Sequence, residues 1–133
     1  MRGLVRRGLL WLRGKTLDRV ALRAARRGGG PFSLIRHLGR RSGRTYETPV
    51  VLARVPEGFV VELAYGEDVN WFRNVEAAGG CVVRFGGEDH RVDAIDPLDA
   101  SAGRAAFPAL RRAILTATHR TRFRLLRSAG QAA

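Results

Sequence analysis

PFSLIRHLGRRSGRTYETPVVLAR, residues 31–54, is the stretch that decides the fold of this chain. Its apolar residues follow a strand-like pattern over 32–38 and again over 45–54. Between them, residues 39–44 contain two glycines and a serine, which are typical of a turn. The stretch therefore predicts two antiparallel strands joined by a short turn that carries three arginines.

Downstream of this pair, short strand-like segments alternate with glycine-containing turns. Short turns join antiparallel neighbours, whereas parallel strands need long crossover connections. A doubly wound parallel sheet is therefore not expected. A short helix is predicted over residues 69–77, and further strands are predicted at residues 59–64, 81–85 and 88–95, the last two joined by the Gly86-Gly87 turn.

The C-terminal part is predicted to be mainly helical. Asp99 can cap a helix that runs to about residue 107, and Pro108 fits the first turn of a helix that runs to about residue 119. Residues 122–126 fit either a last short strand or more helix. Four or five antiparallel strands with one inserted helix suit a small, partly open barrel, so the expected fold class is α+β.

The first thirty residues form a basic amphipathic segment. Apolar residues recur there at three- and four-residue steps, with arginines between them, which predicts one or two helices over residues 3–27. Gly28-Gly29-Gly30 then interrupts the helical pattern. We therefore divide the chain into an N-terminal helix with a glycine-rich hinge, residues 1–30, and a barrel domain with C-terminal helices, residues 31–133. The N-terminal helix either lies on a membrane surface or packs on its own barrel or on a second subunit, and both alternatives stay open.

The positive charge is concentrated at the two ends of the chain. Residues 1–30 carry +8, residues 31–98 carry −2 and residues 99–133 carry +6, out of a net charge of +12. Cationic ends favour an anionic partner such as lipid headgroups, nucleic acid or a polyanionic cofactor tail. Nucleic acid is disfavoured, because aromatic residues do not alternate with basic ones on the predicted strands.

The cysteine content and hydropathy indicate a cytoplasmic protein. The single cysteine, Cys81, excludes an internal disulfide, suits a reducing compartment and is interpreted as a buried structural thiol. No apolar stretch reaches membrane-spanning length. The expected location is therefore the cytoplasm, with peripheral attachment to the inner face of the membrane through the basic N-terminal helix as a further hypothesis.

The turn at residues 39–44 is the main candidate for ligand binding. Successive backbone N–H groups in such a turn can converge on an anion, and guanidinium groups match phosphate or carboxylate oxygens in pairs. The alternative is a solvated basic hairpin. The turn residues suited to an anion are Arg40, Arg41, Ser42, Gly43 and Arg44.

The chain shows no catalytic machinery that would work without a cofactor. His37, His90 and His119 are scattered, and there are no paired carboxylates and no second cysteine beside them. They indicate neither a metal site nor a catalytic triad, and each is interpreted as a surface or strand histidine. A cofactor enzyme can lack such machinery, because the cofactor carries the chemistry.

A second group of residues lies in the predicted helix at 69–77. Trp71 and Asn74 stand three positions apart, on the same side of a helical turn, and by themselves they are typical of packing residues. Residues 39–43, Thr48-Pro49-Val50, Gly58 and Trp71-Phe72-Arg73-Asn74, in this order and spacing, resemble the nitroreductase family of deazaflavin-dependent oxidoreductases. The resemblance covers about residues 30–96.

The resemblance implies a small split β-barrel of mainly antiparallel strands, with an inserted short helix and helical N- and C-terminal extensions. It implies coenzyme F-420 (8-hydroxy-5-deazaflavin) as the cofactor, with FMN less favoured. The turn would hold the phosphate and acidic tail, and the residues after it would back the ring and order the pocket wall. The implied cofactor-binding residues are Arg40, Arg41, Ser42, Gly43, Arg44, Thr48, Pro49, Val50, Gly66, Trp71 and Asn74.

The expected activity is hydride transfer from reduced coenzyme F-420 to an apolar acceptor, such as a quinone, a lipid or a nitro compound. Tyr65 is the candidate catalytic residue, which would orient the acceptor or assist proton delivery. The alternative is a non-catalytic protein of the same fold that binds a lipid, a fatty acid or the cofactor at a membrane surface. The chain is expected to be a monomer or a homodimer.

Overall fold

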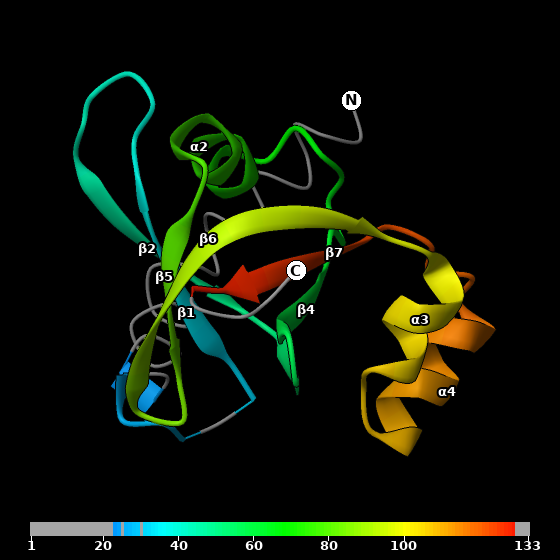
Figure 1. Cartoon of the computed structure of the whole chain (residues 1–133). Helices are drawn as coiled ribbons and strands as arrows, with labels where there is room; N and C mark the ends of the chain where they lie inside the picture. The colour runs from blue at the N-terminus through cyan, green and yellow to red at the C-terminus, as the bar shows by residue number, and fades with distance from the viewer. Residues whose placement is uncertain (1–22, 25, 30, 130–133) are drawn as a thin grey trace, which may run out of the picture.

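The computed structural model describes residues 23–24, 26–29 and 31–129 of the chain, and its centre is a seven-stranded antiparallel sheet (Figure 1). The strands are β1 (Ser33–Leu38), β2 (Thr45–Val50), β3 (Leu52–Val55), β4 (Gly58–Glu62), β5 (Cys81–Phe85), β6 (Glu88–Leu98) and β7 (Phe123–Ser128). The helices are α2 (Asn70–Ala78), α3 (Ala100–Ala105) and α4 (Ala109–Ala117). The α+β class with mainly antiparallel strands is confirmed, although seven strands replace the four or five expected.

The sheet closes into a split barrel at Val51. The strand order is β2-β1-β5-β6-β7-β4-β3, so β2 and β3 are the two edges of the sheet. Only Val51 separates these edges along the chain. Since one residue spans less than 4 Å, the sheet must curl until its two edges meet there. The single strand predicted over residues 45–54 is therefore wrong, because barrel closure divides it into β2 and β3.

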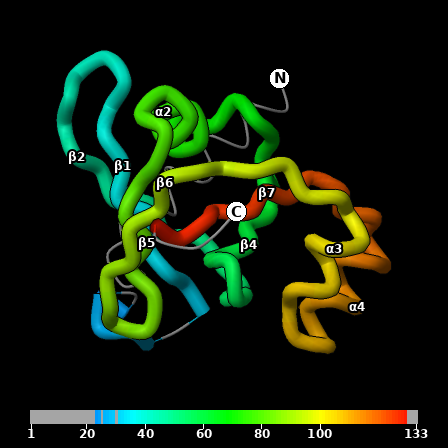
Figure 2. Tube along the Cα trace, in the orientation of Figure 1, coloured from blue at the N-terminus to red at the C-terminus, as the bar shows by residue number. Residues whose placement is uncertain are grey.

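Two apolar clusters hold the sheet, one on each face of β4. Phe59 and Val61 belong to the cluster inside the barrel, which α2 covers through Val75. Val60, between them, belongs to a second cluster that includes Leu115 of α4 and Phe107 of the connection between α3 and α4. Alternate residues of a strand face opposite sides, so β4 is buried on both faces. Figure 2 shows the consequence, with α2 and the α3–α4 pair lying on different sides of the strands.

The helix boundaries follow local signals. The helix α2 ends at Gly79, which adopts a left-handed conformation with φ of 74°. The Asp99 side chain accepts a hydrogen bond of 2.8 Å from the backbone N–H of Ala102, so the predicted cap of α3 is confirmed. In α2 the fully buried aromatic residue is Phe72, whereas Trp71 is partly buried and packs against the cluster inside the barrel, as expected of a packing residue.

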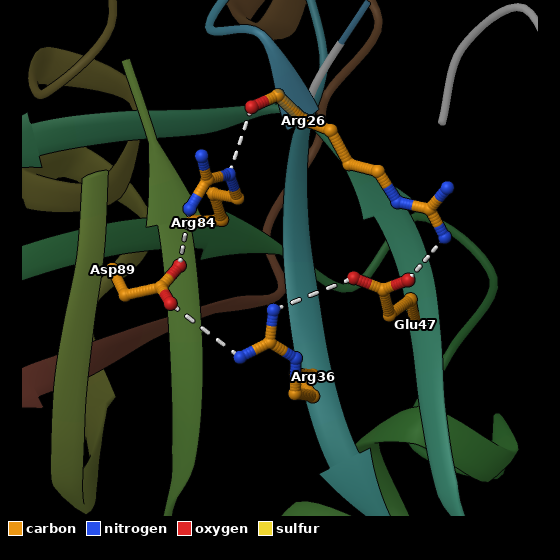
Figure 3. Close-up of polar contacts among 5 residues, drawn as sticks. All are labelled: Arg26, Arg36, Glu47, Arg84 and Asp89. Atoms are coloured by element: carbon orange, nitrogen blue, oxygen red, sulfur yellow. Dashed lines mark hydrogen bonds and ion pairs between the residues drawn. The ribbon is translucent and has the colours of Figure 1, made fainter. Parts of the chain in front are cut away.

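The end of the N-terminal segment contacts the barrel through polar groups (Figure 3). The Arg26 guanidinium pairs with Glu47 of β2 at 2.5 Å, and the Arg26 carbonyl accepts a hydrogen bond of 2.8 Å from Arg84 of β5. Arg36 of β1 lies between Glu47 and Asp89, at 3.6 and 3.5 Å. Arg26 is thereby attached to β2 and β5, the two strands that flank β1 in the sheet.

Gly28 brings the chain against the β5–β6 turn. Its φ is +81°, and a Cβ at this position would lie 2.6 Å from the backbone of Gly86. A glycine is needed here because both the backbone conformation and the contact exclude a side chain. The division of the chain at residue 30 stays a prediction, and most of the predicted N-terminal helix lies outside the described residues.

Candidate functional site

The turn between β1 and β2 is closed by its own hydrogen bonds. The Gly39 N–H donates to the Arg44 carbonyl at 2.7 Å, and the Gly43 N–H donates to the Gly39 carbonyl at 2.9 Å. The Ser42 hydroxyl accepts from the Arg44 N–H at 3.2 Å and lies 3.3 Å from the Tyr46 hydroxyl. The predicted turn is confirmed, and it projects from the sheet beside α2 (Figure 1).

Helix α2 holds one arginine of this turn. The Asn74 side-chain oxygen accepts two hydrogen bonds from Arg40, one from the backbone N–H at 3.1 Å and one from the guanidinium at 2.8 Å. The Arg40 guanidinium also lies 3.4 Å from the side-chain oxygen of Asn70, the first residue of α2. Asn74 itself is buried, with an exposed fraction of 5%. Arg40 is an exposed residue, but hydrogen bonds to the buried Asn74 side chain fix its orientation.

His37 of β1 connects the Asn74 side chain to β2. Its Nδ1 lies 3.0 Å from Asn74 Nδ2, and its Nε2 lies 2.9 Å from the Thr48 hydroxyl. Because the Asn74 oxygen already accepts from Arg40, the Asn74 amide must donate to Nδ1 of His37. His37 then carries its proton on Nε2 and donates to Thr48. Burial lowers the pKa of His37, because the charged ring would lose its hydration, so the ring is neutral at pH 7.

Two pockets adjoin at this place. The polar pocket, of about 580 Å³, lies between the turn and the start of α2. The apolar pocket, of about 320 Å³, lies between β2, the loop after β4 and the helix α4. Both pockets are lined by Thr48 and Trp71, so these two residues stand at their junction.

The structure brings most of the predicted site residues to these pockets. Six of them line the polar pocket, namely Arg40, Arg41, Ser42, Thr48, Trp71 and Asn74. The apolar pocket is lined by Thr48, Pro49, Val50, Tyr65, Gly66 and Trp71. Gly43 and Arg44 lie in the same turn but are exposed and line neither pocket. The roles assigned to all these residues stay predictions.

Several residues that line the pockets were not predicted from the sequence. The strand position predicted for His37 is correct, but its burial and its two polar partners were not foreseen. Tyr46, whose ring stacks on that of His37 with centroids 5.8 Å apart, was not assigned to the site. Phe107 comes from the connection between α3 and α4, and Arg111 and Leu115 come from α4. A local pattern marks none of them, since long-range packing alone brings them to the pockets.

The other candidate groups show no sign of chemistry of their own. Burial raises the pKa of the Cys81 thiol to about 12, so the group is a protonated thiol at neutral pH. Among the described residues there is no cluster of histidine, cysteine and acidic side chains that would suit a metal ion. No helix in the described part of the chain has the length and apolar character needed to cross a membrane.

The described part of the chain thus combines a split barrel with an arginine-bearing turn beside an apolar pocket. Residues 16–122 match the family described as "F420H(2)-dependent quinone reductase". The match spans most of the chain, so the protein belongs to this family and is an F-420-dependent reductase. Coenzyme F-420 is accordingly its cofactor.

Two solved structures share the fold. One is an F420-H2 dependent reductase (FDR-A), with a TM-score of 0.50 and 20% identity over 71% of this chain and 90% of that chain. The other is described as a domain-swapped dimer, with a TM-score of 0.52 and 17% identity over 86% of this chain and 95% of that chain. At these identities the likeness supports the fold alone. No curated protein matches the chain.

Proposed function

We propose that the protein transfers a hydride from reduced coenzyme F-420 to a small apolar acceptor, such as a quinone, a conjugated lipid or a nitro compound. The observation that supports this proposal is the junction of the two pockets at Thr48 and Trp71. A ligand that joins a polyanionic tail to a flat ring can occupy a cationic and an apolar pocket at once. Coenzyme F-420 has these two parts.

The polar pocket fits the tail. Arg40 and Arg41 supply guanidinium groups, and Ser42 supplies a hydroxyl donor. Charge-assisted hydrogen bonds of this kind contribute about 1.5–3 kcal/mol each. Because Asn74 already orients Arg40, less conformational entropy is lost when an anion binds. Gly43 and Arg44 would complete the turn around the tail.

The apolar pocket fits the ring and the acceptor. Pro49 and Val50 of β2 would back the ring, with Trp71 at the junction and Gly66 in the loop beside it. When bound, the reduced coenzyme supplies the hydride, so the chain has to orient the reactants and keep water out. Phe107 and Leu115 supply the apolar wall for this purpose.

Two polar side chains in the apolar pocket suit an oxidised acceptor. Tyr65 lines this pocket and is about half exposed, so its hydroxyl can orient the acceptor or pass a proton. Arg111 of α4 lines the same pocket, and its guanidinium suits a carbonyl or nitro oxygen. Reduction of a quinone to a hydroquinone takes one hydride and one proton. A hydrogen-bond donor beside the oxygen of the quinone therefore assists this reduction.

The binding test uses Arg41, which lies in the turn and has no role in the packing of the barrel. We expect coenzyme F-420 to bind more tightly than FMN, and Arg41→Ala to weaken F-420 binding about tenfold or more. The control is Arg54→Ala, which removes the same charge from an exposed position of β3 outside both pockets. Equal affinity for FMN, or equal effects of the two variants, would show that the turn does not bind the tail.

The turnover test separates catalysis from mere binding. The purified protein is mixed with reduced F-420 and a short-chain quinone, and oxidation of the cofactor is followed by its absorbance. We expect catalytic oxidation that depends on both the quinone and the protein. A protein that binds F-420 or a fatty acid but gives no turnover with any quinone or nitro acceptor would instead support the non-catalytic alternative.

A further inference from the structure

His37 lines the polar pocket, and its polar contacts there are more than its packing alone explains. Its exposed fraction is 5%, and both of its ring nitrogens have polar partners. Both partners, Asn74 and Thr48, line the polar pocket. His90 provides the contrast within the same chain. Its ring packs against the edge of Phe59, and its buried Nε2 has no hydrogen-bond partner.

We propose that His37 is a positioning residue that, through Asn74, holds Arg40 ready for the anionic tail of the cofactor. The inference rests on the proposed function, because it assigns a purpose to the orientation of Arg40. His37 does not touch the tail in this proposal. It acts on Arg40, which would contact the tail.

The direction of the hydrogen bonds carries the inference. A side-chain amide can rotate by 180° and exchange its oxygen and its nitrogen. The Nδ1 atom of His37 is an acceptor, so it requires the Asn74 nitrogen on its side. The Asn74 oxygen must then face the turn, where it accepts both the backbone and the side-chain N–H groups of Arg40. The acceptor Nδ1 of His37 and the two N–H groups of Arg40 therefore favour the same orientation of the Asn74 amide.

The hydroxyl of Thr48 and the ring of Tyr46 complete the surroundings of His37. In this tautomer the Thr48 hydroxyl oxygen accepts a hydrogen bond from the Nε2–H group of His37, and the unprotonated Nδ1 accepts from Asn74. The Tyr46 ring is nearly parallel to the His37 ring, with an interplanar angle of 23°, so it limits rotation of the imidazole. The hydrogen bonds therefore run in one direction, with Arg40 donating to Asn74, Asn74 donating to His37 and His37 donating to Thr48, from the turn to the junction of the pockets.

The first test compares two substitutions at His37 by the equilibrium binding of coenzyme F-420. His37→Phe keeps a ring but removes the acceptor, and we expect it to weaken binding at least fivefold. His37→Asn places an oxygen near the position of Nδ1, and we expect it to restore binding to within about twofold of the wild type. His119→Asn changes an exposed histidine outside both pockets and should have no effect. Thermal unfolding of each variant confirms that it is folded.

The second test is a double-mutant cycle, which measures whether His37 acts through Arg40. In an Arg40→Ala background, His37→Phe should no longer weaken F-420 binding. In an Arg41→Ala background the fivefold loss should persist, because no hydrogen bond joins Arg41 to Asn74 among the described contacts. A purely structural role for His37 predicts the same loss in both backgrounds, and that result would overturn the inference.

The tautomer of His37 gives a readout that needs no ligand. Nitrogen-15 chemical shifts of the imidazole should show a protonated Nε2 and an unprotonated Nδ1 at pH 7.5. The opposite tautomer would overturn the inference, because Asn74 would then turn its nitrogen towards Arg40. If the wild type fails to bind F-420, the proposed function fails. If it binds F-420 but His37 and Arg40 are not coupled, only this inference fails.

Discussion

At the scale of single residues, the burial of His37 links the site to pH. Burial lowers the pKa of this residue below its usual value near 6.5. The unfolded chain therefore takes up a proton at a higher pH than the folded chain does. The contribution of His37 to stability is complete above pH 6.5 and is lost as the pH falls from there towards the pKa of the folded state.

The ionisable side chains that share a pocket with His37 come from several elements. They are Arg40 and Arg41 of the turn, Tyr46 and Glu47 of β2, Arg36 of β1, Cys81 of β5, and Asp89, Arg91 and Asp93 of β6.

The pH dependence of stability tests this assignment. When the pH is lowered from 7.5 to 5.5, the urea concentration at the midpoint of unfolding should fall more for the wild type than for His37→Asn, because asparagine cannot take up the proton. His119→Asn should keep the wild-type difference. Equal pH dependence of the His37→Asn variant and the wild type would contradict the assignment.

At the scale of elements, the packing of α3 depends on Gly103. A Cβ at this position would lie 2.2 Å from Cγ of Phe123, and Phe123 is fully buried in β7. Gly103→Ala should therefore destabilise the protein by about 1–3 kcal/mol, which exceeds the gain of about 1 kcal/mol from the better helix propensity of alanine. Ser101→Ala, at an exposed position of α3, should change stability by less than about 0.5 kcal/mol. Urea unfolding measures both, and a rise in the midpoint of Gly103→Ala would contradict the close packing.

At the scale of the whole molecule, the concentration of charge at the chain ends predicts attachment to anionic membranes. Residues 1–30 carry +8, and each well-placed basic residue contributes about 1 kcal/mol near an anionic surface. We expect the full-length protein to sediment with phosphatidylglycerol vesicles, to sediment poorly with neutral vesicles, and to dissociate as salt is added. This behaviour would fit a cytoplasmic protein on the inner membrane face. Light scattering on the same preparation distinguishes a monomer from a homodimer.

A truncated chain provides the control for membrane binding. The chain should begin at Arg23, because this start retains the ion pair of Arg26 with Glu47 and the contact of Gly28 with the β5–β6 turn. We expect it to be folded and to stay in the supernatant with every vesicle. If it still sediments, the C-terminal arginines bind the membrane. If it unfolds, the N-terminal segment is part of the barrel structure.

The sequence by itself determined the features that depend on near neighbours. The cap at Asp99, the end of α2 at Gly79 and the turn at residues 39–44 were predictable because their partners lie within a few positions. The resemblance to a family named Arg40, Arg41 and the other turn residues. It also named Pro49 and Trp71, which line the two pockets. Local conformational preferences depend on residues that are close in the sequence, so they can be recognised from the sequence alone.

Only the tertiary structure decided how these parts meet. Nothing local marks Val51 as the break between two strands, because the break results from the two edges of the sheet meeting there. The contact of Arg40 with Asn74 joins residues 34 positions apart, and Arg111 reaches the apolar pocket from the far C-terminal helix. His37 looked like an ordinary strand residue until both of its nitrogens were seen to have partners. Hydrogen-bond direction and burial are properties of the packed molecule, because they depend on which distant groups the barrel brings within reach.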